Sequence, residues 1–481
     1  MNGPDVLVLG GGVAGLTAAI ALARRGAAVD VLEQDRTPAP TGRRAAGNWT
    51  RDGVPHAGQA HVFTPECHRL LAEELPDVLG RLLALGAREL PVRCGDGTEV
   101  TAFAVRRPVF DWLLRRVAER EPELRVHAGA TVRGLRTADD RLTGVMLGSG
   151  LFTGSLAVDA TGRSGAVRRW LDELGHPSAR LRSVGDRAGF GAAASGTGPD
   201  PAAGRGLALG VDPVAAGTDT ESWAGPSAEP WADHYTRCYA LHWPGDPTAL
   251  NLGLAAGGDF PGYRCRVVPG DNDTFSVTFT VPRAEAPAAR RTDSGGVYGG
   301  VETAFTPEAD SAAGLAGLAG RAGRAALCDP DGFQAVAARV PWIADWVDSS
   351  VAMPLSPVRT WRPRPRPLPR PTPGGEPLDG LVSVGDAIRP GRLDDDRGVA
   401  VALASGLAAA RAIEQAWRDG SGVPSVATLT AVERAGRASG CGHERVPGPS
   451  SDELAELLTS VVHPGRGGRA GTDLLTARRR G

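Results

Sequence analysis

The sequence predicts an α/β fold in which a parallel sheet is interrupted by a second sheet of mixed or antiparallel strands. Residues 5–35 contain an apolar strand, a glycine-rich turn, an alanine- and leucine-rich helix and a second strand, which is the order of a βαβ unit. Residues 238–283 contain short alternating runs separated by Pro-Gly and Asp-Asn turns, as expected for antiparallel strands. An alanine-rich helix is predicted after residue 398, so C-terminal helices should complete the fold.

The composition excludes several classes of function. The 481-residue chain has 53 basic and 55 acidic residues, so no bulk attraction to nucleic acid or to a membrane surface is expected. It contains no lysine, which excludes Schiff-base and P-loop chemistry because both need a lysine amine. Its six cysteines show no CxxC spacing, so we expect neither a metal site nor a disulfide framework, and a reducing cytosol fits best.

The apolar run near the N-terminus resembles a secretion signal but lacks the features of one. No basic segment precedes residues 6–23, and the glycines at 10–12 interrupt the run. No other run approaches the roughly 18 apolar residues that a membrane span needs. We therefore expect a cytoplasmic protein without a membrane span.

The glycine-rich turn predicts a dinucleotide site. Gly10, Gly12 and Gly15 have the G-x-G-x-x-G spacing. In this pattern the first glycine makes the turn, the second lets a pyrophosphate approach the backbone, and the third lets the helix pack on the strand. Val13 and Ala14 begin the helix, whose N-terminal dipole favours the anion.

An acidic residue completes this fingerprint. Glu33 ends the second predicted strand, about twenty residues after Gly12, where a carboxylate binds a ribose hydroxyl. With strand, turn, helix, second strand and acid in order, residues 5–35 predict a Rossmann-type domain. The fingerprint alone does not separate NAD from FAD.

Three further segments separate the two cofactors. They are VRRPVFDWLLRRVAE (residues 105–119), LAVDATGRSGAVRRWL (156–171) and GLVSVGDA (380–387). They resemble motifs of FAD-dependent aromatic hydroxylases and squalene-epoxidase-like oxygenases, and their order and spacing match along most of the chain. The resemblance implies a non-covalently bound FAD.

The resemblance also implies which residues bind the cofactor. Arg107 would contact FAD, although a solvated arginine at a helix start is an alternative. Asp159 and Gly162 would close the pocket behind the cofactor. Asp386, after Gly385, would bind the ribityl hydroxyls, the alternative being a helix N-cap. Further cofactor contacts are predicted for Arg44, Gly398 and Val399.

A histidine-containing segment shows a second resemblance. DGVPHAGQAHVF (residues 52–63) is similar to the Gly-Val-Pro … His-x-His segment of bacterial polyether-epoxidase-type flavoproteins. His61 matches, whereas Gly58 and Gln59 stand where that segment has arginine and histidine, and His56 is extra. The resemblance places the segment beside the flavin, so His56 and His61 are candidates for tuning the flavin or a substrate oxygen. A structural role is equally compatible with the pattern.

The same family interrupts its nucleotide fold with a substrate-binding sheet, which predicts a discontinuous domain organisation. The FAD-binding domain is expected at 1–80, 100–175 and 350–420, the substrate-binding domain at 81–99 and 176–349, and a C-terminal helical segment and tail at 421–481. On the clearest predicted strand, Phe275, Val277, Phe279 and Val281 share one face. They form either core or the flavin side of the substrate pocket.

The loop after Asp386 departs from the family pattern. Flavin oxygenases usually have an Asn-Pro-x-x-Gly-x-Gly loop there, whose N–H groups stabilise the reduced flavin. Here Asp394, Asp395 and Asp396 stand in its place, and only Gly398 remains. Three carboxylates beside the flavin would hinder its reduction unless arginines neutralise them or they face solvent. Asp396 is accordingly also a candidate catalytic carboxylate.

Two functions fit these features. The first is an FAD-dependent monooxygenase that hydroxylates or epoxidises an apolar polyketide- or terpenoid-like metabolite, as in antibiotic biosynthesis. The alternative is a redox-neutral cyclase or isomerase that keeps FAD as a structural cofactor. No second dinucleotide fingerprint follows a predicted strand, so NAD(P)H would visit transiently or a partner reductase would supply electrons. The Trp-x-Trp-x-Ile-Pro segment and the lysine of flavin halogenases are missing, which disfavours halogenation.

The resemblance also predicts how two substitutions compare. Asp386→Ala should lose most of the FAD, because a charged hydrogen bond to the ribityl chain is worth about 1.5–3 kcal/mol. Glu33→Ala should weaken FAD binding less, because the ribose that Glu33 binds would lie nearer solvent.

Overall fold

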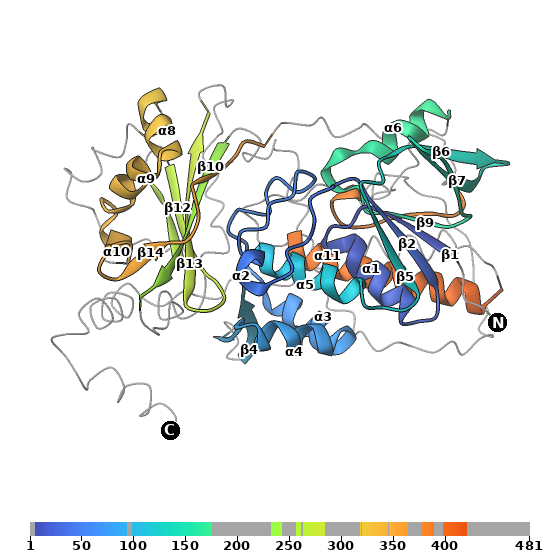
Figure 1. Cartoon of the computed structure of the whole chain (residues 1–481), viewed down its shortest axis with the longest axis horizontal. Coiled ribbons are helices and arrows are strands. Elements are labelled where there is room, and N and C mark those ends of the chain that lie inside the picture. The colour runs from blue at the N-terminus through green and yellow to red at the C-terminus, as the bar shows by residue number, and fades with distance from the viewer. Residues whose placement is uncertain are drawn as a thin grey trace, which may run out of the picture. The chain divides into compact units, whose positions relative to one another are not determined.

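The computed structural model describes residues 5–93, 99–175, 232–242, 256–260, 263–283, 318, 320–344, 346–363, 378–388 and 398–420 (Figure 1). Contacts within the chain separate residues 182–227 from the rest, and that segment lies outside the described residues. The predicted C-terminal segment 421–481 and the acidic loop with Asp394, Asp395 and Asp396 also lie outside them.

A five-stranded parallel sheet forms the first layer. Its strand order is β16-β9-β1-β2-β5, and every neighbouring pair is parallel. The strands are β1 (Asp5–Leu9), β2 (Ala28–Glu33), β5 (Leu124–Ala128), β9 (Ala157–Asp159) and β16 (Leu381–Ser383). Because β16 comes from a distant part of the sequence, the chain returns to this sheet after building the second one, as the sequence predicts.

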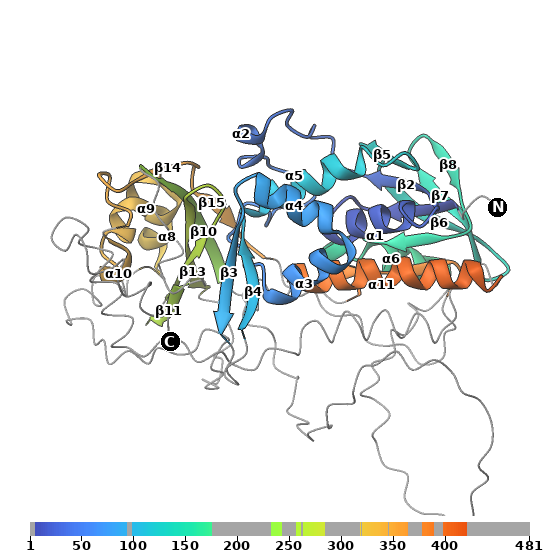
Figure 2. The ribbon, with the colours of Figure 1, turned by 90° about the horizontal axis from the view of Figure 1, so that it is seen from below.

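Helices cover one face of the parallel sheet. α1 (Val13–Ala23) packs on α5 (Arg107–Ala118) and on α11 (Gly398–Arg418), and Figure 2 shows α11 running alongside α1. The two helices approach closely because Gly406 has no side chain, since a Cβ there would lie 2.7 Å from the carbonyl oxygen of Ala14. The other described elements of this part are α2 (Arg43–Ala46), α3 (Pro65–Glu74), α4 (Pro76–Ala84), α6 (Ala166–Glu173), the hairpin β3 (Arg88–Arg93) and β4 (Glu99–Ala104), and the sheet β6 (Val132–Ala138), β7 (Arg141–Leu147) and β8 (Gly150–Thr153).

α11 corrects one expectation from the sequence. Among the described residues it is the one helix long and apolar enough to cross a membrane, so the expectation that no such run exists was wrong. Most of its apolar stretch is buried inside the fold, where it packs on α1. Its apolar composition is therefore explained by burial in the core.

The second large sheet is antiparallel. Its order is β11-β12-β13-β10-β14, and β15 also pairs with β10. The elements are β10 (Ala232–Leu241), β11 (Ala256–Phe260), β12 (Tyr263–Pro269), β13 (Thr274–Pro282), β14 (Ala352–Pro354) and β15 (Arg359–Trp361), with helices α8 (Arg321–Cys328), α9 (Pro330–Ala337) and α10 (Pro341–Ala344). The predicted combination of a Rossmann-type parallel sheet with an antiparallel sheet is thus confirmed. The predicted domain boundaries stay predictions.

The apolar face of β13 belongs to the core of this sheet. Phe275, Val277, Phe279 and Val281 are fully buried, and Phe279 makes an edge contact with Phe333 of α9 at a centroid distance of 5.4 Å. Of the two roles predicted for this face, the structure shows core packing.

Candidate functional site

The glycine turn lies where β1 ends and α1 begins, at the carboxyl edge of the parallel sheet. Gly10 has φ +113°, which favours glycine. A Cβ on Gly15 would lie 2.0 Å from the carbonyl oxygen of Gly10, so turn and helix pack directly on each other. A Cβ on Gly12 would meet no atom within 4 Å. Gly12 is the N-cap of α1 and supplies no side-chain cap, so open space adjoins the positive end of this helix.

Glu33 is held at the same edge by a buried ion pair. Its Oε2 accepts hydrogen bonds from the backbone N–H of Gly11 at 2.8 Å and from the guanidinium of Arg51 at 2.7 Å. Its Oε1 accepts one from the N–H of Asp35 at 2.8 Å. Glu33 and Arg51 are each 5% exposed. Since a carboxylate oxygen accepts two hydrogen bonds, Oε1 keeps capacity for a hydroxyl donor.

Two charged residues of α5, Arg107 and Asp111, lie next to the Glu33–Arg51 ion pair. Arg51 lies 3.9 Å from a carboxylate oxygen of Asp111, and the Nε of Arg107 donates to Asp111 at 2.5 Å. Arg107 is 8% exposed, so the alternative of a solvated arginine at the helix start is wrong. Sequence reasoning missed Arg51 and Asp111. The spacing of Asp111 one turn after Arg107 is a signal for this pair, whereas no motif marks Arg51.

Asp159 holds its own turn. Its carboxylate accepts hydrogen bonds from the N–H and the hydroxyl of Thr161 and from the hydroxyl of Ser383. Burial raises the pKa of Asp159. Gly162 follows with φ +59° at the start of a short 3₁₀ turn, where β9 gives way to α6. Asp159 and Gly162 therefore fix the conformation of the turn that follows β9 at the sheet edge.

The Gly-Asp turn follows β16 at the same edge. Gly385 has φ +58°, and its N–H donates to the Ser405 hydroxyl on α11 at 2.8 Å. Asp386 lies 3.6 Å from the guanidinium of Arg163 and is half-buried. Because α11 begins only at Gly398, Asp386 is not its N-cap.

The remaining predicted cofactor residues differ in their surroundings. Ala14 lies inside the α1–α11 contact and Val13 is buried. Gly398 and Val399 begin α11, with Val399 buried and open space beside Gly398. Arg44 is exposed on α2, and among the described residues no hydrogen bond or ion pair joins it to the others. The structure thus gathers most of these residues at one sheet edge but leaves Arg44 apart from the buried charges.

The two histidines lie in an aromatic cluster. Their ring centroids are 5.7 Å apart, and the ring of His56 lies 5.8 Å from that of Trp361. The guanidinium of Arg163 lies 5.7 Å from the Trp361 ring, which links the histidines to Asp386. The sequence did not predict that Trp361 lies beside the histidines. Its position depends on how β15, about 300 residues later in the chain, folds back next to them.

Both histidines have a lowered pKa, which favours the neutral ring at pH 7. Burial, together with the charges of Arg107 and Arg163, lowers the pKa of His56 to about 3. Burial and the charge of Arg107 lower the pKa of His61 well below its ordinary value, although the carbonyl oxygen of Gln59 lies 2.9 Å from its Nδ1. Among the described residues the Nδ1 of His56 has no hydrogen-bond partner. A neutral His61 that donates its Nδ1–H to Gln59 keeps Nε2 as an acceptor, whereas a neutral His56 can donate or accept a hydrogen bond.

The lowered pKa of His56 predicts a pH-dependent stability. A histidine with a lowered folded-state pKa contributes stability above its unfolded pKa of 6.5, and this stability is lost as the pH falls toward about 3. Between pH 7 and pH 5, the wild type should lose on the order of 2 kcal/mol more unfolding free energy than His56→Gln. Urea unfolding at both pH values measures this, with His242→Gln, at an exposed histidine, as control. Parallel pH dependence in the wild type and His56→Gln would contradict the expectation.

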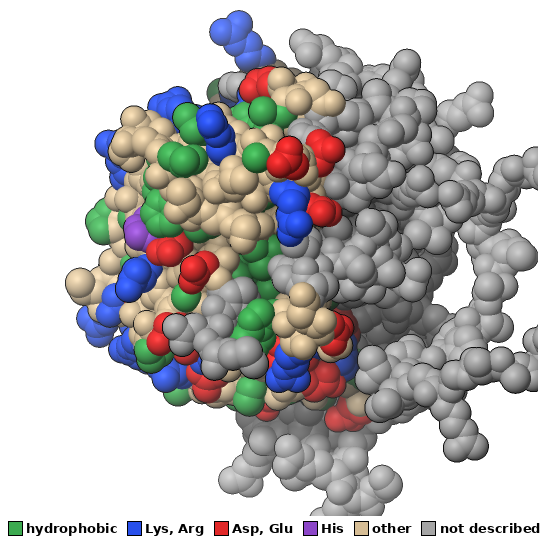
Figure 3. Space-filling view, turned by 90° about the vertical axis from the view of Figure 1, so that its right-hand side faces the viewer, with side chains coloured by type: hydrophobic (Ala, Val, Ile, Leu, Met, Phe, Trp, Pro, Cys, Tyr) green, Lys and Arg blue, Asp and Glu red, His purple; other side chains and the backbone are tan. Residues whose placement is uncertain are grey.

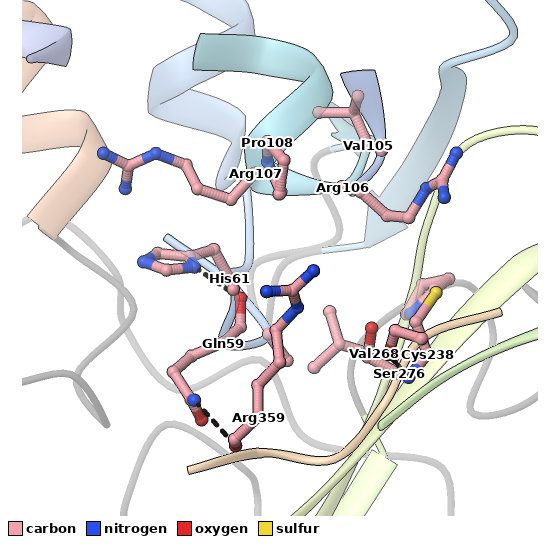
Figure 4. A pocket seen from close by; sticks show the side chains of 15 residues that line it. Gln59, His61, Val105, Arg106, Arg107, Pro108, Cys238, Val268, Ser276 and Arg359 are labelled. Carbon is pink, nitrogen blue, oxygen red and sulfur yellow. Dashed lines mark hydrogen bonds between the residues drawn. The ribbon is translucent and has the colours of Figure 1, made fainter. Parts of the chain in front are cut away.

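A pocket opens beside His61 at the start of α5 (Figure 4). The empty space between its walls amounts to about 430 Å³, a figure that includes open solvent. Its lining residues come from the antiparallel sheet, from the start of α5 and from loops: Gly47, Gly58, Gln59, Ala60, His61, Val105, Arg106, Arg107, Pro108, Cys238, Val268, Pro269, Ser276, Ser356 and Arg359. Arg107 belongs both to this lining and to the buried charges that lead to Glu33.

Comparison with known proteins agrees with this geometry. Residues 5–168 match the family described as FAD dependent oxidoreductase. That stretch contains the glycine turn, Glu33, Arg107 and Asp159. The match covers about a third of the chain, at its N-terminal end. A search of curated proteins finds no match to the chain.

Several solved structures with a similar fold are described as flavin- or FAD-dependent enzymes. The flavin-dependent brominase Bmp2 is 14% identical, with 99% of this chain and 98% of that chain covered and a TM-score of 0.50. The flavin-dependent halogenase CmlS is 15% identical, with 100% and 77% covered and a TM-score of 0.51. PqsL, described as a probable FAD-dependent monooxygenase from Pseudomonas aeruginosa, is 16% identical, with 96% and 97% covered and a TM-score of 0.48. At these identities, the likeness to Bmp2 and CmlS shows a shared fold alone.

The residues at the sheet edge fit an FAD. The open space over Gly12 and the uncapped start of α1 suit a pyrophosphate. The remaining acceptor capacity of Glu33 suits a ribose hydroxyl, and the half-buried carboxylate of Asp386 suits the ribityl chain. These residues would hold the cofactor at the carboxyl edge of the parallel sheet.

Gly12→Ala is expected to keep the fold and to weaken FAD binding at least about tenfold, because the new methyl group occupies the space for the pyrophosphate. Gly42→Ala is the matched control, since Gly42 is the N-cap of α2 and a Cβ there also meets no atom within 4 Å. Titration of FAD into both apoproteins gives the two affinities. Equal affinities would place the pyrophosphate elsewhere.

Proposed function

We propose that the protein is an FAD-dependent oxygenase that hydroxylates or epoxidises a small metabolite in the pocket beside His61. The observation that carries this proposal is the double role of Arg107. Its side chain donates to Asp111, which lies 3.9 Å from Arg51, the ion-pair partner of Glu33. Arg107 also lines the pocket. A substrate in this pocket would lie next to a cofactor held at the sheet edge. The family match and the fold support a flavin as that cofactor.

Bound FAD supplies the redox chemistry with dioxygen, and the chain supplies position and a dry environment. The neutral rings of His56 and His61 orient a substrate oxygen by hydrogen bonding without adding charge. The valine, proline and alanine side chains of the lining pack against an apolar substrate body, such as that of a polyketide- or terpenoid-like secondary metabolite. Asp396 is not assigned a role, because it lies outside the described residues.

NAD(P)H is the proposed reductant, arriving transiently or through a reductase, in a cytoplasmic setting. Basic and acidic side chains are interspersed over the face in Figure 3, in line with the balanced composition. Halogenation is not proposed, because the chain contains no lysine and the halogenase neighbours share the fold alone.

Anaerobic reduction tests the redox role of the flavin. The purified yellow protein is mixed with NADPH or NADH without oxygen, and flavin absorbance is followed before and after air is admitted. Bleaching by the nicotinamide and recovery in air support the proposal. An oxidised flavin that neither nicotinamide reduces, in a protein that still converts substrate, would favour the cyclase.

A further inference from the structure

The pocket beside His61 is lined by positive charge. Its lining includes three arginines, at positions 106, 107 and 359, and no aspartate or glutamate. Such a lining is unusual for a purely apolar ligand, because a buried cation without a counter-ion is costly. Whether the pocket presents a positive charge to a ligand therefore depends on which of these arginines are paired with carboxylates.

Two of the three arginines are neutralised by the protein itself. Arg106 makes two side-chain hydrogen bonds to Asp271, at 2.9 and 2.8 Å, and its backbone N–H donates to the same carboxylate. Arg107 is paired with Asp111. In Figure 4 the side chains of Arg106 and Arg107 extend to opposite sides of the pocket.

Arg359 differs from both. Its guanidinium projects into the middle of the pocket, between the sides that carry His61 and Val268 (Figure 4). Among the described residues, the guanidinium of Arg359 makes one hydrogen bond, a long one of 3.4 Å to the carbonyl oxygen of Asn48. No described carboxylate forms an ion pair with this guanidinium. Burial lowers the pKa of Arg359, and the nearby Cys238 thiol group acts in the opposite direction.

The surrounding residues hold Arg359 in this position. The side-chain amide of Gln59 donates to the carbonyl oxygen of Arg359 at 3.1 Å, and Thr236 of β10 holds Gln59 through its hydroxyl at 2.6 Å. A Cβ on Gly58 would lie 2.3 Å from the Cδ of Arg359. The absence of a side chain at position 58 therefore gives the arginine its path into the pocket.

We propose that Arg359 binds a carboxylate of the substrate, so that the substrate is an organic acid with an apolar body. A guanidinium matches a carboxylate with two parallel hydrogen bonds, which gives both affinity and orientation. The apolar side chains of Val105, Val268 and Pro269 line the same pocket and contact the rest of the acid. This inference rests on the proposed function and narrows its substrate class from an apolar metabolite to an acidic one.

A matched pair of ligands tests the proposal. Calorimetric titration of the FAD-loaded protein with 2-naphthoate and with its neutral amide, 2-naphthamide, compares ligands of nearly equal shape. The wild type should bind the acid at least about tenfold more tightly than the amide, because one charge-assisted pair separates them. Arg359→Gln should abolish this preference, and Gly58→Ala should reduce it by displacing the arginine side chain.

Two control variants keep the comparison specific. Arg69→Gln removes an exposed arginine on α3, and Gly80→Ala places a methyl group on α4 where no atom lies within 4 Å. Both should keep the wild-type preference for the acid. Equal binding of acid and amide by the wild type, or no binding of either, overturns the proposal, as does a preference that survives Arg359→Gln. FAD content and reduction by NAD(P)H are recorded on the same samples, so a failure of the oxygenase proposal is seen independently of acid binding.

Discussion

Glu33→Ala is expected to lower the free energy of unfolding by about 3–5 kcal/mol, because it leaves Arg51 as a buried cation without its closest partner. It also removes the acceptor for the N–H groups of Gly11 and Asp35. Urea unfolding of the protein without FAD measures the effect on the fold alone. Glu73→Ala is the control, since Glu73 is paired with Arg69 on the surface and should cost about 0–1 kcal/mol. Similar losses in the two variants would show that the Glu33–Arg51 pair is unimportant.

This expectation changes how Glu33 compares with Asp386. The sequence predicted that Glu33→Ala weakens FAD binding less than Asp386→Ala, because the ribose bound by Glu33 would lie near solvent. The structure places Glu33 in a buried ion pair. Asp386 is half-buried and lies 3.6 Å from Arg163, so Asp386→Ala should leave stability within about 1 kcal/mol of the wild type. Its expected defect is confined to FAD occupancy, whereas Glu33→Ala should impair fold and occupancy together.

Asp271→Ala is expected to cost a similar amount, about 3–5 kcal/mol. Asp271 is 1% exposed and accepts three hydrogen bonds from Arg106, the residue at the start of α5. Although burial acts to raise the pKa of Asp271, its bonds to Arg106 lower that pKa below the ordinary value. This contribution is therefore present above the unfolded pKa of 3.8 and is lost as the pH falls through the folded value.

The neighbouring Asp273 provides the control for Asp271. Asp273 pairs with Arg88 nearer the surface, and its φ of +55° suits asparagine better than alanine. Asp273→Asn should change the unfolding free energy by less than about 1 kcal/mol at neutral pH. If Asp271→Ala were equally mild, the ion pair would not be needed to hold α5 against the turn between β12 and β13.

The part of the site that sequence predicted is the part built from local patterns. Gly10, Gly12, Gly15 and Glu33 lie within one βαβ unit, whose turn geometry and strand length fix their relative positions. The Gly-Asp turn was predicted for a related reason, since the end of any parallel strand of the sheet lies at the same edge. The parallel and antiparallel sheets likewise follow from strand periodicity.

The part that sequence missed depends on packing between distant segments. Arg51 meets Glu33 across a loop, and Trp361 and Arg359 come from β15, about 300 residues after the histidines they approach. Nothing in the spacing of these residues marks them, because their partners are set by the pairing of β15 with β10. The role of the acidic loop remains a prediction, since Asp394, Asp395 and Asp396 lie outside the described residues.

The most direct test of the proposed oxygenase is the mass of the product formed under isotopically labelled dioxygen with NAD(P)H. Candidate acids with an apolar body are incubated with the FAD-loaded protein, beside an anaerobic sample without reductant. We expect a product that gains one labelled oxygen atom, and no product in the anaerobic sample. Complete anaerobic conversion to a product without new oxygen would contradict it and would identify the protein as a redox-neutral cyclase.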